Sequence, residues 1–119
     1  MIAITGASGY LGRALLPVLV QQYGHRGEVV VLSRQATAHS PTLHFDLTQT
    51  ANFLTCLEGV TTLVHCAGVA HAHGSKQAYT AVNVQGTVAL AQAALKQGVS
   101  RFIFVSSMNV IPKDALSPD

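Results

Sequence analysis

The chain has 119 residues, of which 49% are hydrophobic and only 10% charged, and its formal net charge is +2. So small a charge, without a cluster of basic residues, argues against nucleic acid or an anionic membrane as a partner. Cys56 and Cys66 form no CxxC pair, and neither a leader sequence nor a membrane-spanning run is visible. We therefore expect a cytoplasmic protein with reduced thiols.

The first residues predict a strand, a tight turn and a helix. The apolar run Ile2–Thr5 is the expected strand, and apolar residues at helical spacing predict a helix over 10–23. Between them, Gly6 would allow a sharp turn, Gly9 would let a pyrophosphate approach the backbone, and Gly12 would let the helix lie close to the strand. The helix N-terminus would then face the phosphates. The alternative is a structural turn that holds no ligand.

Further apolar runs alternate with polar loops and helical patterns. We expect strands at 28–33, 43–45, 60–66 and 101–106, and helices at 48–57 and 75–97, the first of these helices capped by Thr48. This alternation favours an α/β fold, a Rossmann-type doubly wound parallel sheet with strand order 3-2-1-4-5 that is truncated after strand 5. In that order, one edge of the sheet collects the residues at the strand ends, which are Gly6, Ser33, Asp46, Cys66 and Ser106.

Five short motifs stand at the ends of the expected elements. In chain order they are Thr5-Gly6-Ala7-Ser8-Gly9-Tyr10-Leu11-Gly12, Asp46-Leu47, His65-Cys66-Ala67-Gly68, Asn83-Val84-Gln85-Gly86-Thr87 and Val105-Ser106-Ser107. Together they resemble the motifs of the extended short-chain dehydrogenase/reductase family, which includes the NAD-dependent epimerases and dehydratases of nucleotide sugars.

The resemblance implies roles for these residues. Asp46 would take the adenine amino group, the His65 motif would line the nicotinamide ribose, and Ser107 would be the catalytic residue that holds the substrate hydroxyl. Asn83, a poor helix former, would fix the loop around the site through its side chain. Residues of these motifs and of the end of the second expected strand form the set of candidate cofactor-binding residues. They are Gly6, Ser8, Gly9, Tyr10, Leu11, Gly12, Ser33, Arg34, Asp46, Leu47, Cys66, Ala67, Gly68, Asn83 and Ser106.

The end of the second expected strand bears on the choice of dinucleotide. An acid there would accept a hydrogen bond from the ribose 2′-hydroxyl of NAD, but the residues present are Leu32, Ser33 and Arg34. Ser33 and Arg34 offer donors and a positive charge that suit a 2′-phosphate. We therefore expect NADP as the cofactor, with NAD as the alternative. The other interpretation of Arg34 is a solvated loop arginine.

The histidines have plainer interpretations. His65 ends a buried strand, where a neutral ring satisfied by the backbone is favoured over a catalytic one. His71 and His73 could suggest a metal site, but no acidic or cysteine partner stands near them, so we expect no metal.

The family resemblance also implies a base that this chain lacks, a tyrosine followed four residues later by a lysine. None of the three tyrosines, Tyr10, Tyr23 and Tyr79, has such a lysine. We therefore expect residues 1–119 to be a single dinucleotide-binding domain, the N-terminal fragment of a longer nucleotide-sugar enzyme, and inactive by itself.

Two alternatives remain open, a sensor or scaffold that binds dinucleotide without catalysis and a structural domain without a ligand. The fifth expected strand would form an exposed edge that can pair with another copy, so a homo-oligomer is also expected.

Overall fold

The computed structural model describes residues 1–24, 28–35, 41–66 and 81–105. Its five strands form one parallel sheet in the order β3-β2-β1-β4-β5, which confirms the predicted Rossmann-type topology. The strands are β1 (Ile2–Thr5), β2 (Val29–Ser33), β3 (Thr42–His44), β4 (Thr62–His65) and β5 (Arg101–Phe104).

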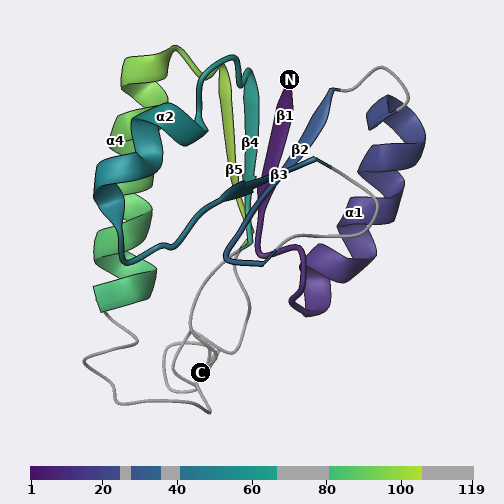
Figure 1. Ribbon diagram of the computed structural model, residues 1–119, viewed down its shortest axis with the longest axis horizontal. Coiled ribbons are helices and arrows are strands. Elements are labelled where there is room, and N and C mark those ends of the chain that lie inside the picture. The colour runs from purple at the N-terminus through teal and green to yellow at the C-terminus, as the bar shows by residue number, and fades with distance from the viewer. Residues whose placement is uncertain (25–27, 36–40, 67–80, 106–119) are drawn as a thin grey trace, which may run out of the picture.

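Helices cover both faces of the sheet (Figure 1). Helix α1 (Tyr10–Tyr23) lies on one face, and α2 (Phe53–Cys56) and α4 (Thr87–Gln97) lie on the other. Because successive strand residues point to opposite faces, each strand supplies both layers of the core. On the α1 face Ile4, Val31 and Val64 pack together with Leu15, Leu16 and Leu19. On the other face the larger cluster includes Ala3, Leu32, Leu63, Phe53, Leu57 and Leu90.

The strands lie where the sequence predicts them, with bounds shifted by one or two residues. The predicted ranges 28–33, 43–45 and 60–66 correspond to β2, β3 and β4, while β5 ends at Phe104 rather than at residue 106. Helix α1 matches its predicted range, although Pro17 lies inside it.

The predicted helix over 48–57 is wrong in its start and its cap. A 3-10 helix, η2 (Thr50–Asn52), comes first and α2 follows it, with Gln49 at the N-terminal cap position of η2. Thr48 caps neither helix, because its hydroxyl and its N–H both donate to Oδ1 of Asp46, at 2.6 and 2.9 Å. Thr48 therefore forms a local turn with the carboxylate of Asp46 instead of capping the helix.

The described part of the predicted helix over 75–97 consists of two pieces. A π-helical segment, η3 (Ala81–Gly86), leads directly into α4. Gly98 ends α4 in the left-handed conformation, with φ of 79°, as its position predicts. Residues 75–80 lie outside the described residues.

Candidate functional site

The carboxyl ends of the strands and the first turns of α1 and α4 lie along the same edge of the sheet, the lower edge in Figure 1. In doubly wound sheets, ligands bind outside this edge, near the point where the strand order reverses. That point lies at β1, which pairs with β2 on one side and β4 on the other.

The turn between β1 and α1 depends on its glycines. Gly6 has φ of 71°, in the region that glycine adopts without strain. A Cβ atom on Gly12 would stand 1.9 Å from the carbonyl oxygen of Gly6, so only glycine allows the helix to lie this close to the turn. At Gly9 a Cβ atom would make only an ordinary 3.4 Å contact with that oxygen. The predicted close packing at Gly12 is therefore confirmed, whereas the fold itself leaves room for a side chain at Gly9.

The N-terminus of α1 faces outward from this turn. Gly9 is the cap residue, and no side chain among the described residues caps the helix. Ser8, Tyr10 and Leu11 are exposed, and the side chain of Tyr10 retains 86% of its accessible surface. Uncapped N–H groups at the positive end of a 14-residue helix form a site that suits a phosphate.

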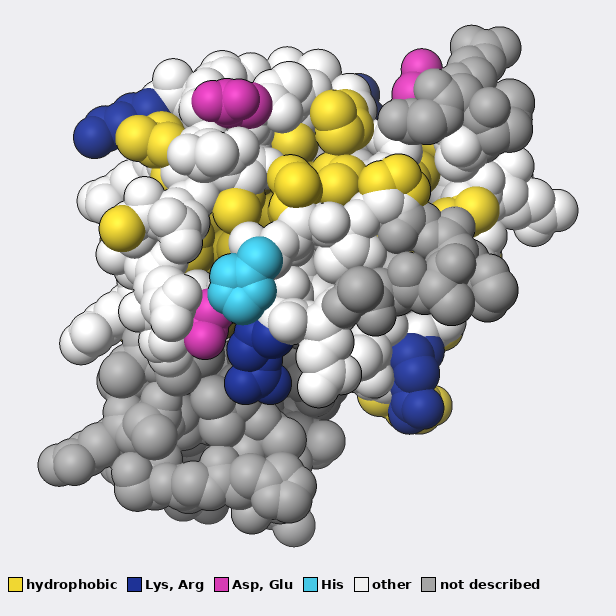
Figure 2. Space-filling view, viewed as in Figure 1, with side chains coloured by type: hydrophobic (Ala, Val, Ile, Leu, Met, Phe, Trp, Pro, Cys, Tyr) yellow, Lys and Arg dark blue, Asp and Glu magenta, His cyan; other side chains and the backbone are white. Residues whose placement is uncertain are grey.

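The ends of β2 and β3 carry exposed polar and charged side chains. Figure 2 shows a basic, an acidic and a histidine side chain gathered in one patch of the viewed face. The two hydrogen bonds from Thr48 hold the pKa of Asp46 below its ordinary value, and the electrostatic influence of Arg34 and His44 lowers it further. Arg34 is exposed, and the hydroxyl of Ser33 accepts a hydrogen bond from the N–H of Gln35 at 3.2 Å. Asp46 is thus an ionised acceptor beside an arginine.

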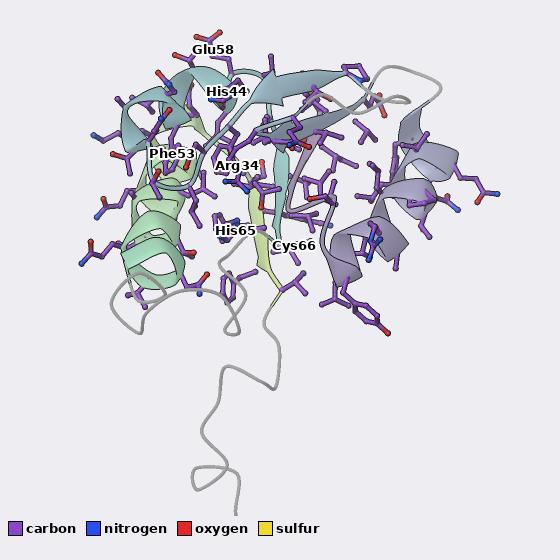
Figure 3. The ribbon with its side chains drawn as sticks, turned by 60° about the horizontal axis from the view of Figure 1, so that its bottom comes forward. Arg34, His44, Phe53, Glu58, His65 and Cys66 are labelled. Atoms are coloured by element: carbon purple, nitrogen blue, oxygen red, sulfur yellow. The ribbon has the colours of Figure 1, made fainter. Side chains whose placement is uncertain are left out.

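His65, at the end of β4, is fully buried between the sheet and α4 (Figure 3). Its Nδ1 lies 2.7 Å from the hydroxyl of Thr5, and its Nε2 lies 2.9 Å from the hydroxyl of Thr87. The rings of Phe102 and Phe104 lie beside it, with centroids 6.0 and 5.7 Å from that of the imidazole. Burial lowers the pKa of His65 to about 4, so the ring is neutral at physiological pH. The neutral ring was predicted, but its partners are threonine hydroxyls and not the backbone.

Cys66 follows His65 and is half-buried. Its N–H donates to the hydroxyl of Thr5 at 3.0 Å and lies 3.2 Å from the Thr5 carbonyl oxygen. Burial raises the pKa of the Cys66 thiol and also that of the Cys56 thiol. Both cysteines are free thiols, as predicted, and both stay protonated at neutral pH.

The last residue of η3 contacts the loop that carries Asp46. A Cβ atom on Gly86 would stand 2.7 Å from Cγ of Leu47 and 2.8 Å from the Leu47 carbonyl oxygen. Gly86 of the Asn-x-x-Gly-Thr motif therefore permits a close approach to the Asp46-Leu47 motif. Thr87 of the same motif contacts His65, the first residue of the His65–Gly68 motif. Asn83 is half-buried on the same segment, and its predicted role stays a prediction.

Two participants at this edge were missed in the sequence, Thr5 and Thr87. The sequence did place both near the predicted site, since Thr5 ends the first expected strand and Thr87 directly follows Gly86. Nothing in the sequence pattern indicated that both hydroxyls meet the same imidazole.

Several predicted site residues lie outside the described residues. They are Ala67, Gly68, Ser106 and Ser107, together with His71 and His73. Within the ranges that the structure does describe, no three His, Cys, Asp or Glu side chains come together as metal ligands do. None of the helices in those ranges is long and apolar enough to cross a membrane.

The topology and the glycine turn define an α/β protein of the Rossmann class. Residues 2–119 match the model of the NAD dependent epimerase/dehydratase family, and the chain belongs to that family.

Individual relatives agree with this assignment. UDP-glucose 4-epimerase of Vibrio cholerae is 36% identical over 117 residues, which cover 92% of this chain and 35% of the relative. A short-chain dehydrogenase/reductase superfamily protein from Agrobacterium tumefaciens, solved with bound NAD, is 29% identical with a TM-score of 0.79, covering 95% of this chain and 34% of that one. MoeE5 in complex with UDP-glucose and NAD is 27% identical with a TM-score of 0.75, covering 93% of this chain and 38% of that one. The chain thus spans between a third and two fifths of the length of these proteins.

Proposed function

We propose that the carboxyl edge of the sheet binds the adenosine and pyrophosphate of a nicotinamide dinucleotide. The observation that carries the proposal is the uncapped N-terminus of α1, held close to the end of β1 by the Gly6–Gly12 contact. This cradle fits a pyrophosphate, because Gly9 leaves backbone exposed at the entrance to the helix. When bound, the dinucleotide supplies a hydride acceptor and donor.

Each predicted residue has a place in this proposal. Gly6, Gly9 and Gly12 form the turn, and the exposed Ser8, Tyr10 and Leu11 flank it. Asp46 accepts a hydrogen bond from the adenine amino group, for which its lowered pKa keeps it ionised, with Leu47 beside it. The ribose of the nicotinamide half lies along Cys66, Ala67, Gly68 and Ser106, and Asn83 orients the surrounding loop.

For the dinucleotide itself we propose NADP, with NAD as the alternative. The support is the composition at the end of β2, where Ser33 and the exposed Arg34 provide donors and positive charge and no acid stands. Arg34 also lies near enough to Asp46 to lower its pKa, so its charge acts over the outer part of the edge. Similar structures hold NAD, which supports the alternative.

We propose that the whole enzyme acts on a nucleotide sugar as an epimerase, dehydratase or reductase. One similar structure contains UDP-glucose and another UDP-glucuronic acid, each with NAD. Ser107 would orient the substrate hydroxyl. Because residues 1–119 hold no tyrosine followed four residues later by lysine, the function proposed for this fragment, a single domain, is binding without turnover. The second candidate is a sensor or scaffold that binds dinucleotide without catalysis. A Tyr-x-x-x-Lys motif encoded in the forty or so codons after residue 119 would support the enzyme, and its absence there would support the sensor or scaffold.

We also propose that the protein is cytoplasmic and that it self-associates. Among the described elements β5 is an outer strand, with Ile103 46% and Phe104 50% exposed. An outer strand with exposed apolar side chains can pair with a second copy. Light scattering across a concentration series would show a mass above that of the 12.5 kDa monomer, whereas a monomer mass throughout would contradict self-association.

Calorimetric titration with ADP-ribose, NAD and NADP tests the binding proposal. We expect ADP-ribose to bind, and NADP to bind more tightly than NAD if Arg34 meets the 2′-phosphate. Gly9→Val, which crowds the phosphate position, should weaken binding by tenfold or more, about 1.4 kcal/mol. Ala14→Val adds the same side chain to the exposed side of α1, one turn away, and should bind as the parent does. Absence of binding by all three ligands would contradict the proposal.

A further inference from the structure

One buried side chain connects three elements of the candidate site. The imidazole of His65 joins Thr5, which is 60 residues earlier in the chain, to Thr87, which is 22 residues later. Thr5 ends β1, His65 ends β4, and Thr87 begins α4. In Figure 3 the ring of His65 lies between the strand ends and α4.

The hydrogen-bonding capacities of the His65 imidazole and the two threonine hydroxyls are complementary. A neutral imidazole has one N–H donor and one acceptor nitrogen, and each threonine hydroxyl can both donate and accept. The ring can therefore donate to one hydroxyl and accept from the other, which satisfies both nitrogens without water. Among the described residues, no buried side-chain nitrogen or oxygen is left without a hydrogen-bond partner. The surrounding Phe102 and Phe104 rings favour one ring orientation by packing.

The hydrogen bonds continue beyond the ring at the Thr5 end. The Thr5 hydroxyl also accepts from the N–H of Cys66, 3.0 Å away, so it is shared between the side chain of His65 and the backbone that follows it. Thr5 is the residue directly before Gly6, where the chain turns with φ of 71°. A change in the position of the Thr5 hydroxyl therefore acts on the first peptide of the glycine turn and on the backbone at the end of β4.

At the other end, Thr87 follows Gly86, which packs directly against Leu47. The start of α4 is thus held from two sides, by the Thr87 hydrogen bond to the ring and by the Gly86 contact with the loop after β3. A helix with a π-helical turn at its start has a local irregularity of the kind that is frequent at functional sites.

We propose that Thr5, His65 and Thr87 are positioning residues that hold the glycine turn, the end of β4 and the start of α4 in their binding geometry before a nucleotide arrives. The inference rests on the proposed dinucleotide binding at this edge. None of the three needs to touch the nucleotide, because their effect passes through the backbone of Gly6, Cys66 and Gly86. Preorganisation of this kind increases affinity by removing an ordering cost from the binding step.

The test compares Thr87→Val, which removes the hydroxyl and keeps the shape, with Thr87→Ser, which keeps the hydroxyl. We expect Thr87→Val to raise the dissociation constant for ADP-ribose by about two- to tenfold, the range for one net hydrogen bond, and Thr87→Ser to restore it. Thr62→Val is the matched control, since Thr62 stands at the opposite end of β4. It should bind ADP-ribose as the parent does.

A second measurement needs no ligand. In ¹H–¹⁵N spectra of the ligand-free protein, Thr87→Val should shift the amide signals of Cys66 and Gly6, while Thr62→Val and Thr87→Ser should leave them near their parent positions. A purely local packing defect at α4 would not move the signal of Gly6, which lies on β1's side of the ring.

The outcomes separate the two proposals. If the parent binds ADP-ribose and Thr87→Val binds equally well, the positioning role is wrong and the binding function stands. If Thr87→Ser fails to restore both binding and the amide signals, the hydroxyl is not the relevant group and the inference is overturned. If the parent binds no nucleotide, the proposed function fails, and the spectra still decide whether the ring links Thr87 to the turn.

Discussion

The candidate site has two halves that are held in place by different means. The inner half comprises the end of β1 with its glycine turn, the end of β4 and the start of α4. Here the fully buried Thr5 and His65 and the half-buried Thr87 are joined across 60 and 22 residues of chain. In the outer half, at the ends of β2 and β3, the polar side chains are exposed or half-buried, and their hydrogen bonds, Thr48 to Asp46 and Gln35 to Ser33, each span two residues. The global fold therefore builds the inner half, and local turns build the outer half.

This difference corresponds to the parts of the proposed ligand. A pyrophosphate is common to every nicotinamide dinucleotide, and the turn proposed to bind it is exposed but is anchored to the core at both ends, by the buried Thr5 and Gly12. The ribose 2′ position distinguishes NADP from NAD, and the residues proposed to meet it lie in the exposed half. Substitutions there can change preference at little cost in stability, because few contacts of the core depend on them.

Gly12→Ala should break the inner half and is the largest effect that we expect. The new Cβ would stand 1.9 Å from a backbone oxygen, so the turn or the helix must move. We expect a loss of about 3 kcal/mol or more in the free energy of unfolding, measured by urea denaturation. Gly9→Ala is the control in the same turn, since its 3.4 Å contact is ordinary, and it should cost about 1 kcal/mol or less. Equal losses for both variants would contradict the argument.

The buried ring makes the inner half sensitive to acid. The pKa of His65 is about 4 in the folded protein and 6.5 ordinarily, so the unfolded chain takes up the proton first as pH falls. Its contribution to stability is complete above about pH 6.5 and is lost progressively as pH falls to 4, by up to about 3 kcal/mol. Urea denaturation at several pH values measures this loss. An NMR titration assigns it to the ring, and a midpoint near 6.5 for His65 would show that the ring is not held neutral.

Thr48→Val tests the outer half and should have the smallest effect. It removes the hydroxyl that is the first cause of the lowered pKa of Asp46, so that pKa should move up toward its ordinary 3.8. The stability that Asp46 contributes is present above its unfolded pKa and is lost as pH falls through the folded one, so the variant should lose less stability in acid. At neutral pH we expect a change within about 1 kcal/mol. A carbon-detected titration of the Asp46 carboxyl measures the shift, and an unchanged pKa would contradict the assignment.

The parts of the molecule that could be predicted from the sequence are those with a local signature. Glycine spacing predicted the β1 turn, and apolar runs separated by helical patterns predicted the strand order. The cap at Thr48 was predicted wrongly, because Thr and Asp two residues apart can bond each other in competition with the helix end. The partners of His65 could not be predicted, since they come from positions 60 and 22 residues away and depend on how the packed elements meet.

The central position of β1 has a consequence for the order in which the chain folds as it is synthesised. Its neighbours are β2, which ends at Ser33, and β4, which ends at His65, and a parallel neighbour can form only after the intervening crossover has been made. At a translation rate of about 5–20 residues per second, several seconds pass between the synthesis of β1 and that of its second partner, β4. During that interval the side of β1 that later pairs with β4 has no neighbour, and an unpaired apolar strand edge of this kind is a surface that chaperones protect in nascent chains.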